Sequence, residues 1–356
     1  MSIAKRIFNF VIPVVLLGFL FIDFAAGAEK TSGLVAPGAI LKTVQSGFQG
    51  TEGPATDTEG NVYFTDVFAE QIYKWTWKDG KVTLYREKTG MANGMMFDGK
   101  GNLVICEMGN GRITRDDLKG NVTVIADSLN GKKMRGPNDL WIDPKGGIYI
   151  SHTAMGREML SGGMPGGAPQ GGGASGSSAP GKQTDGQAPA GEMAGGPGRG
   201  ASVNVDKSDL GILYISPDGR KVTLVTTDVT GPNGLIGTPD GKTLYVGDND
   251  NKKIWSYKIN PDGALTDKKL FCEKMTDGMA MDEKNNVYIT NDKSVLAYSP
   301  AGKLLEEIAL PQGCSNVEFC GKDRKTLFIT YRGYIYTLEM AVKGAQLPID
   351  TAGIKR

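Results

Sequence analysis

The sequence predicts an all-β fold, a six-bladed β-propeller with four antiparallel strands per blade. Two observations predict it. One strand–turn–strand motif returns six times along the 356-residue chain. Once a single low-complexity insertion is set aside, successive motifs are spaced by about 44 residues. Four short antiparallel strands within such a period are typical of one propeller blade.

Each repeat begins with an oxygen-bearing side chain just ahead of an apolar strand. A turn rich in Asp, Pro, Gly and Lys follows that strand, as in "DGKGN", "DPKGG" and "DEKNN". Three further strands complete the repeat, as in "VYFTD", "QIYKW" and "VTLYR" of the first one. The oxygen-bearing positions are Glu52, Asn93, Asn138, Asn233, Asp277 and Asn316.

The sixth repeat lacks an obvious fourth strand. The segment "AILKTVQ", residues 39–45, is a candidate for that place. A strand from the N-terminal end would close the ring and remove an exposed sheet edge. A linear solenoid would instead need capping units at both ends, so the sequence favours a closed ring.

Residues 157–207 interrupt the third blade between its second and third strands. They consist mainly of Gly, Ala, Pro and Ser, with almost no large apolar side chain. Such a segment cannot bury enough surface to offset its conformational entropy. We expect a disordered Gly/Pro-rich insertion here.

The N-terminus has the pattern of a secretory signal peptide. Lys5 and Arg6 precede an apolar run, which ends at Ala26-Gly27-Ala28. We therefore expect residues 1–28 to be cleaved, leaving residues 29–356 as a single exported domain, periplasmic or extracellular. An uncleaved anchor is the alternative, because the run is nearly long enough to span a bilayer. No later stretch approaches that length, so no stable span is expected in the mature protein.

Composition narrows the classes of function. The net charge is +1 and charges of both signs are mixed along the chain, which disfavours nucleic-acid binding. His152 is the single histidine, which argues against a Ser-His-Asp enzyme or a histidine zinc site. The cysteines fit no metal or redox motif. Cys106 is expected to be a buried small apolar residue, and Cys314 and Cys320 could form a disulfide if their strand and loop meet.

The repeated oxygens suggest a metal site. The first strand of each blade lines the central channel of a propeller, so these six side chains would converge on its axis. Two carboxylates among amides suit a hard divalent cation, Ca²⁺ best and Mg²⁺ second. The alternative is that each motif is only a turn. A turn accounts well for Asn and Asp at these positions. It accounts poorly for Glu52, because Glu is not a favoured turn residue.

The motifs "TEGPATDTEGNVYFTD", "GPNDLWIDPKGGIYIS", "GPNGLIGTPDGKTLYVGD" and "TDGMAMDEKNNVYIT" resemble the gluconolactonase, regucalcin (senescence marker protein) and strictosidine-synthase-like propellers. The resemblance covers residues 48–340 apart from the insertion. It implies a metal-dependent hydrolase of a lactone, most often a sugar lactone, with Ca²⁺ expected and Zn²⁺ or Mg²⁺ as alternatives. It also implies the ligands Glu52, Asn138, Asn233 and Asp277, with Asn93 and Asn316 as channel residues.

A bound cation would polarise the lactone carbonyl, and Asp277 could act as general base toward water. The chain departs from the family in two places. Met108 stands in "EMGN" where relatives carry histidine, and "SHTAMG" (151–156) differs at the channel mouth. His152 and Arg135 are therefore candidate substrate-binding residues, together with Asn93 and Asn316. A half-exposed strand-end histidine and a solvated surface arginine are the alternatives.

A second class of function stays open at this point. An exported propeller with a flexible loop could bind a carbohydrate, a peptide or an envelope protein without catalysis. The discriminating feature is the ring, because a pure scaffold has no need for two acids and two amides on its axis.

Overall fold

The structure, a computed structural model, describes residues 33–154 and 209–346, which belong to one compact unit. The predicted signal peptide (1–28) and the low-complexity insertion (157–207) lie outside the described residues. No helix among the described residues is long and apolar enough to cross a membrane.

Among the described residues the fold is all-β: 22 of its 24 strands form one six-stranded and four four-stranded sheets, and the other two form a small ribbon. The first sheet begins with β1 (Lys42–Thr56), β2 (Val62–Asp66), β3 (Gln71–Trp75) and β4 (Val82–Glu87). The second contains β5 (Ala92–Phe97), β6 (Leu103–Glu107), β7 (Arg112–Asp116) and β8 (Val122–Ala126).

The remaining sheets repeat the same antiparallel order. The third contains β11 (Gly136–Ile142), β12 (Ile148–Thr153), β13 (Gly211–Ile215) and β14 (Val222–Thr226), and the fourth contains β15 (Pro232–Gly237), β16 (Thr243–Asp248), β17 (Lys253–Ile259) and β18 (Leu265–Cys272). The fifth contains β19 (Met279–Met281), β20 (Val287–Asn291), β21 (Ser294–Tyr298) and β22 (Leu304–Ala309). A small ribbon of β9 (Ser128–Leu129) and β10 (Lys132–Lys133) was not expected from the sequence.

The two ends of the chain meet in the first sheet. Its strand order is β23 (Asn316–Cys320), β24 (Thr326–Glu339), β1, β2, β3, β4. The long strands change partners along their length. β1 pairs with β24 over 42–46 and with β2 over 51–56, while β24 pairs with β23 over 326–330 and with β1 over 334–337. This six-stranded sheet therefore contains two four-strand units. β1 supplies one strand segment to each unit, 51–56 to the first and 42–46 to the last, and β24 supplies two segments to the last unit, 326–330 and 334–337.

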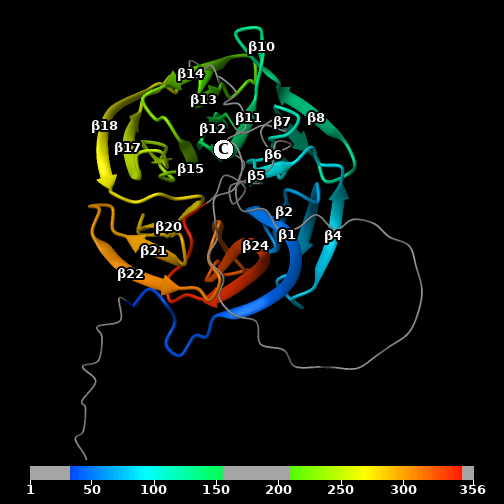
Figure 1. Cartoon of the computed structure of the whole chain (residues 1–356), viewed down its shortest axis with the longest axis vertical. Coiled ribbons are helices and arrows are strands. Elements are labelled where there is room, and N and C mark those ends of the chain that lie inside the picture. Colours follow the sequence, from blue (N-terminus) through cyan, green and yellow to red (C-terminus); the bar gives the residue numbers. More distant parts are fainter. Residues whose placement is uncertain (1–32, 155–208, 347–356) are drawn as a thin grey trace, which may run out of the picture. The chain divides into compact units, whose positions relative to one another are not determined.

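The first strands of successive units contact one another in a closed cycle that runs β1, β5, β11, β15, β19, β23 and back to β1. Figure 1 shows the sheets around this ring, with β1 in blue beside β24 in red. The propeller prediction is confirmed, as is its closure by the N-terminal strand. The pairing of His152 with Gly211 places β12 beside β13, on either side of the predicted insertion.

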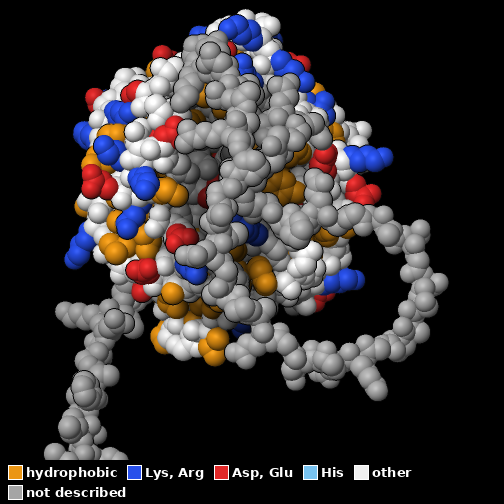
Figure 2. Space-filling view, in the orientation of Figure 1, with side chains coloured by type: hydrophobic (Ala, Val, Ile, Leu, Met, Phe, Trp, Pro, Cys, Tyr) orange, Lys and Arg blue, Asp and Glu red, His pale blue; other side chains and the backbone are white. Residues whose placement is uncertain are grey.

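The core lies between neighbouring sheets. Strands in the middle of a unit are buried on both faces, so they are apolar without alternation, as in the fully buried "LVICE" of β6. The fourth strands alternate or are mostly exposed, as in "VTVIA" of β8. Figure 2 shows basic and acidic side chains interspersed on the visible face.

All four cysteines are free. Cys106 is fully buried, as predicted, and the disulfide considered between Cys314 and Cys320 does not form. The Cys314 thiol instead donates to the Ser294 carbonyl oxygen at 3.1 Å.

Candidate metal centre on the channel axis

A bulge at the start of the inner strands aims the repeated side chains. In β5, Asn93 and Gly94 lie between the pairs Ala92–Glu107 and Met95–Ile105, so two residues oppose one. The same shift flanks Asn138 in β11 and Asn233 in β15, and another follows Glu52 in β1. A bulge re-aims a side chain and bends its strand. The repeated motif therefore forms a β-bulge that orients the repeated side chain, in addition to its turn-forming sequence.

Glycine after the repeated residue lets neighbouring inner strands approach closely. A Cβ on Gly53 would lie 1.9 Å from the Asn93 carbonyl oxygen, and one on Gly278 would lie 2.0 Å from the Asn316 Oδ1. A Cβ on Gly234 would meet the Asp277 carbonyl oxygen at 2.6 Å. Each of these glycines thus touches the repeated residue of the next blade, which draws the ring together.

Hydroxyl groups on the second strand of three blades accept hydrogen bonds from the backbone at or next to the repeated residue. Thr290 Oγ1 accepts the N–H groups of Asp277 at 3.2 Å and Gly278 at 2.9 Å. Ser151 Oγ accepts the Asp139 N–H, and Thr330 Oγ1 accepts the Asn316 N–H. These hydroxyls were not singled out from the sequence, although "VYIT", "IYIS" and "LFIT" share a strand position.

Three of the predicted ligands meet directly. The Asp277 carboxyl is hydrogen-bonded to the side chains of Asn233 and Glu52. A hydrogen bond between two carboxyl groups needs a shared proton, and like charges this close disfavour joint ionisation. Burial raises the pKa of Asp277 to about 6. Burial, followed by the charges of Asp277 and Asp139, raises the pKa of Glu52 well above its ordinary value.

Asp139 is an acid of the channel that sequence reasoning missed. It is buried, and its carboxylate accepts the N–H of Leu140 at 2.9 Å and bonds the side chain of Asn316. Burial raises its pKa to about 7. The signal was present, because Asp139 stands where four of the six motifs carry glycine: Gly53, Gly94, Gly234 and Gly278.

The donor set fits a hard divalent cation. Asn233 Oδ1 is buried and has no hydrogen-bond partner among the described residues. An unsatisfied buried acceptor beside two carboxyl groups is costly unless a cation or a donor meets it. In the described part of the chain, no three His, Cys, Asp or Glu side chains are grouped so that they could hold a metal. The amide oxygens would therefore have to supply part of the shell.

The other predicted site residues divide into two groups. Asn93 and Asn138 line the same cavity as Glu52 and Asp277, whereas Asn316 is buried beside it and bonds Asp139. His152 and Arg135 do not line it. The His152 ring is 2 % exposed, its Nε2 accepts the Arg135 N–H at 3.0 Å, and its Nδ1 lies 2.8 Å from the Asp209 carbonyl oxygen. Both ring nitrogens are thus engaged with backbone, and burial lowers the pKa of His152.

The cavity above the ring has a volume of about 290 Å³. Its floor contains Glu52, Asn93, Asn138 and Asp277. Its walls come from the turn after β2, the end of β6 and the bend within β24, and they contain Val67, Phe68, Met108, Tyr331 and Arg332.

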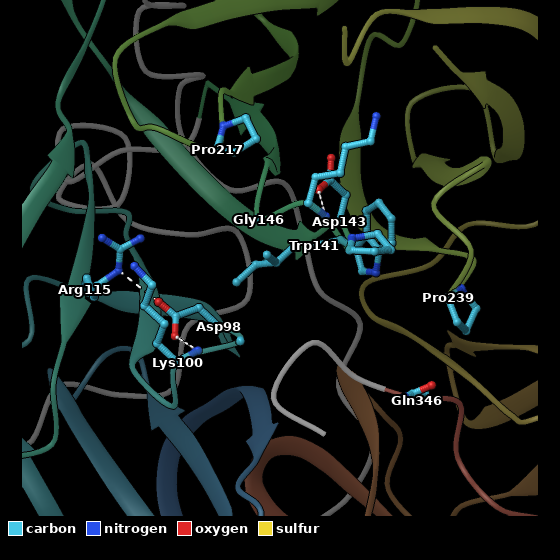
Figure 3. A pocket seen from close by; sticks show the side chains of 13 residues that line it. Asp98, Lys100, Arg115, Trp141, Asp143, Gly146, Pro217, Pro239 and Gln346 are labelled. Atoms are coloured by element: carbon cyan, nitrogen blue, oxygen red, sulfur yellow. Dashed lines mark hydrogen bonds and ion pairs between the residues drawn. The ribbon is translucent and has the colours of Figure 1, made fainter. Parts of the chain in front are cut away.

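A second cavity of about 480 Å³ lies at the turns that follow β5 and β11, at the opposite ends of these strands from Asn93 and Asn138. Figure 3 shows Asp98, Lys100 and Arg115 on one side of it and Trp141 and Asp143 on the other. The carboxylates here are already satisfied. Asp98 accepts the Lys100 N–H at 2.8 Å and pairs with Arg115 at 3.1 Å. They close turns, as the turn prediction required.

Comparison with known proteins decides the family. Residues 50–169 and 182–332 match the SMP-30/Gluconolactonase/LRE-like region. The chain belongs to this family. A gluconolactonase of Zymomonas mobilis is 24 % identical over 325 residues, covering 82 % of this chain and 78 % of that protein.

Solved structures agree on the fold. A gluconolactonase from Xanthomonas campestris superposes with a TM-score of 0.70 at 24 % identity, covering 87 % of this chain and 92 % of that one. A regucalcin from Agrobacterium tumefaciens, described as a calcium-binding protein, has a TM-score of 0.65 at 16 % identity, covering 87 % and 97 %. Membership of the gluconolactonase family indicates a lactone hydrolase.

Proposed function

We propose that this protein is a metal-dependent lactone hydrolase whose divalent cation, Ca²⁺ by preference, binds on the channel axis. The observation that carries the proposal is the convergence of Glu52 and Asp277 with the unsatisfied Oδ1 of Asn233. Asn138 would complete the ligand set at the cavity floor. When bound there, the cation would supply a Lewis acid for the lactone carbonyl.

Asp277 would act as the general base. Its carboxylate lies on the cavity floor and can accept a proton from a water molecule that attacks the carbonyl carbon. The water oxygen forms the new C–O bond, the ring C–O bond breaks, and the proton passes to the leaving alkoxide. The product is a hydroxy acid.

Glu52 would hold the cation and balance its charge. The Gly53 backbone, which lies in the bulge, hydrogen-bonds the Glu52 side chain. Asn93 would orient the substrate beside Met108, whose sulfur its amide faces at 3.9 Å. We also propose export, based on the N-terminal pattern that ends at Ala28.

The test of the base is Asp277→Asn, which keeps the size and an oxygen ligand. We expect lactone hydrolysis to fall by about a hundredfold or more, the range that loss of a general base implies. Proton release from a panel of lactones measures the rate, with saturating Ca²⁺, Mg²⁺ or Zn²⁺. The matched control is Asp240→Asn, an exposed turn aspartate in another blade, which should keep full activity. Equal rates for the wild-type protein and Asp277→Asn would remove Asp277 from the mechanism.

The proposed metal centre can be tested by measurements that do not depend on catalytic activity. Purified protein should contain or take up about one divalent cation per chain, and chelator should lower its melting temperature because the ion stabilises only the folded state. Glu52→Gln should weaken affinity for the ion, as measured by calorimetry. No uptake of any ion and no thermal response to chelator would refute the metal centre, and a protein that takes up metal but opens no lactone would point to a binding scaffold.

A further inference from the structure

The walls of the axial cavity are apolar, although its floor is polar. Val67, Met91 and Met108 form a buried apolar cluster beside it. Phe68 and Tyr331 add aromatic rings from two different blades. The side chains that rise above the ring therefore present mostly carbon and sulfur to a substrate.

Three of the polar side chains in the walls, those of Thr51, Ser315 and Cys314, are already hydrogen-bonded to backbone. The Thr51 hydroxyl donates to the Tyr334 carbonyl oxygen at 2.9 Å and accepts the Tyr331 N–H at 3.0 Å. The Ser315 hydroxyl donates to the Thr51 carbonyl oxygen at 2.9 Å. The Cys314 thiol donates to Ser294, as described above. Among the described wall residues, the Arg332 guanidinium at the rim and the Tyr331 hydroxyl still offer donors, and the guanidinium lies 5.6 Å from the centre of the Tyr331 ring.

Phe68 is held in place despite its exposure. Its side chain is 45 % exposed, yet a Cβ on Gly50 would lie 2.5 Å from its ring, so the ring packs directly on the Gly50 backbone. The N–H groups of Gln49 and Gly50 donate to the Asp66 carboxylate at 2.9 and 2.8 Å, which fixes that backbone. Phe68 is thus a preorganised apolar surface at the mouth of the cavity.

From these contacts we infer that the substrate is a lactone with an apolar arm, which lies against Phe68, Met108 and Tyr331 while the ring carbonyl faces the channel floor. This inference rests on the proposed lactone hydrolysis. A lactone that carries several hydroxyl groups would lose its water there and find few partners in exchange, which costs binding free energy. An alkyl or aryl arm gains from the same walls.

Three lactones of one ring size test the inference by activity. δ-Valerolactone has no arm, δ-decanolactone carries a pentyl arm, and glucono-δ-lactone carries hydroxyl groups. We expect kcat/KM for δ-decanolactone to exceed that for each of the other two by at least about tenfold, equivalent to burial of about two methylene groups. Phe68→Ala should remove most of this preference, because kcat/KM should fall more for δ-decanolactone than for δ-valerolactone, whereas Phe68→Leu should retain part of it.

The matched control is Leu84→Ala, a similarly exposed apolar residue on β4, which is not among the residues that line the cavity. It should leave all three rates unchanged. Circular dichroism and melting temperature confirm that each variant is folded. A glucono-δ-lactone preference in the wild-type protein, or a δ-decanolactone preference that survives Phe68→Ala, would overturn the inference.

A binding measurement separates this inference from the proposed function. The lactams that correspond to δ-valerolactone and δ-decanolactone keep the ring and the arm but resist hydrolysis. Calorimetry should show tighter binding of the pentyl lactam, lost in Phe68→Ala. If this holds while no lactone is opened, the apolar site stands and the hydrolase proposal fails. If lactones are opened but the two lactams bind equally, the hydrolase proposal stands and the apolar site fails.

Discussion

Three carboxyl groups lie within electrostatic reach of one another in the channel: Glu52, Asp139 and Asp277. Their burial makes the protonated forms favourable in the folded protein. The pKa rises from 3.8 to about 6 for Asp277 and to about 7 for Asp139. A cation on the axis would remove this preference, because a positive charge favours the ionised carboxylates. The charge of this cluster therefore links metal content, pH and stability.

The metal-free protein should lose stability as pH rises. Between about pH 4 and pH 7 the folded chain binds more protons at Asp277 and Asp139 than the unfolded chain does, so the free energy of unfolding falls with pH across that window. Calorimetry in chelator should give a higher melting temperature near about pH 5 than near about pH 8. Asp139→Asn should flatten the dependence, and Asp240→Asn should not. A melting temperature that is constant or rises over this range would contradict the prediction.

The inner strands depend on glycines where blades touch. Gly53 has a φ of +45° and its would-be Cβ meets the Asn93 carbonyl oxygen, whereas Gly101 has a φ of +82° with nothing within 4 Å. In both Gly53→Ala and Gly101→Ala, the alanine must adopt a left-handed backbone conformation, which destabilises the folded state. Gly53→Ala must also push two blades apart, so it should be less stable than Gly101→Ala by about 1–3 kcal/mol. Urea denaturation measures the difference, and equal losses would show that the blades yield at no cost.

The strand pattern and turn chemistry were predictable because they repeat. The turn aspartates that follow the inner strands, such as Asp98, obey local rules that any one repeat reveals. The position of Glu52 among amides was predictable from its phase in the repeat. Asp139 was missed because it stands at a position where four of the six repeats carry glycine, so the repeat itself predicts no acid there. Phe68 was missed because it lies in the connection after β2, and Arg332 because it lies at the bend within β24. At both places the register of neighbouring strands, and not periodicity, decides what a side chain contacts.

The ring as a whole depends on one seam between distant parts of the chain. Residues 42–46 of β1 complete the unit formed by β23 and β24. A variant lacking residues 1–46 would leave the outer edge of β24 unpaired and uncover apolar residues such as Ile335. We expect it to aggregate or to melt far below a variant lacking residues 1–32. Size-exclusion chromatography and thermal denaturation compare the two, and equal melting temperatures would show that the seam adds nothing.

That seam also fixes when the molecule can finish folding during synthesis. The partner of residues 42–46 is made almost three hundred residues later, a separation set by Thr43 opposite Tyr336. At about 5–20 residues per second, the N-terminal strand waits roughly 15 to 60 seconds for its neighbour. A ribosome that stops before β24 is complete releases a chain in which residues 42–46 of β1 have no strand to pair with, although residues 51–56 still pair with β2. Such a product should be cleared by proteases, so the cell would retain the full-length ring and no shorter, partly active form.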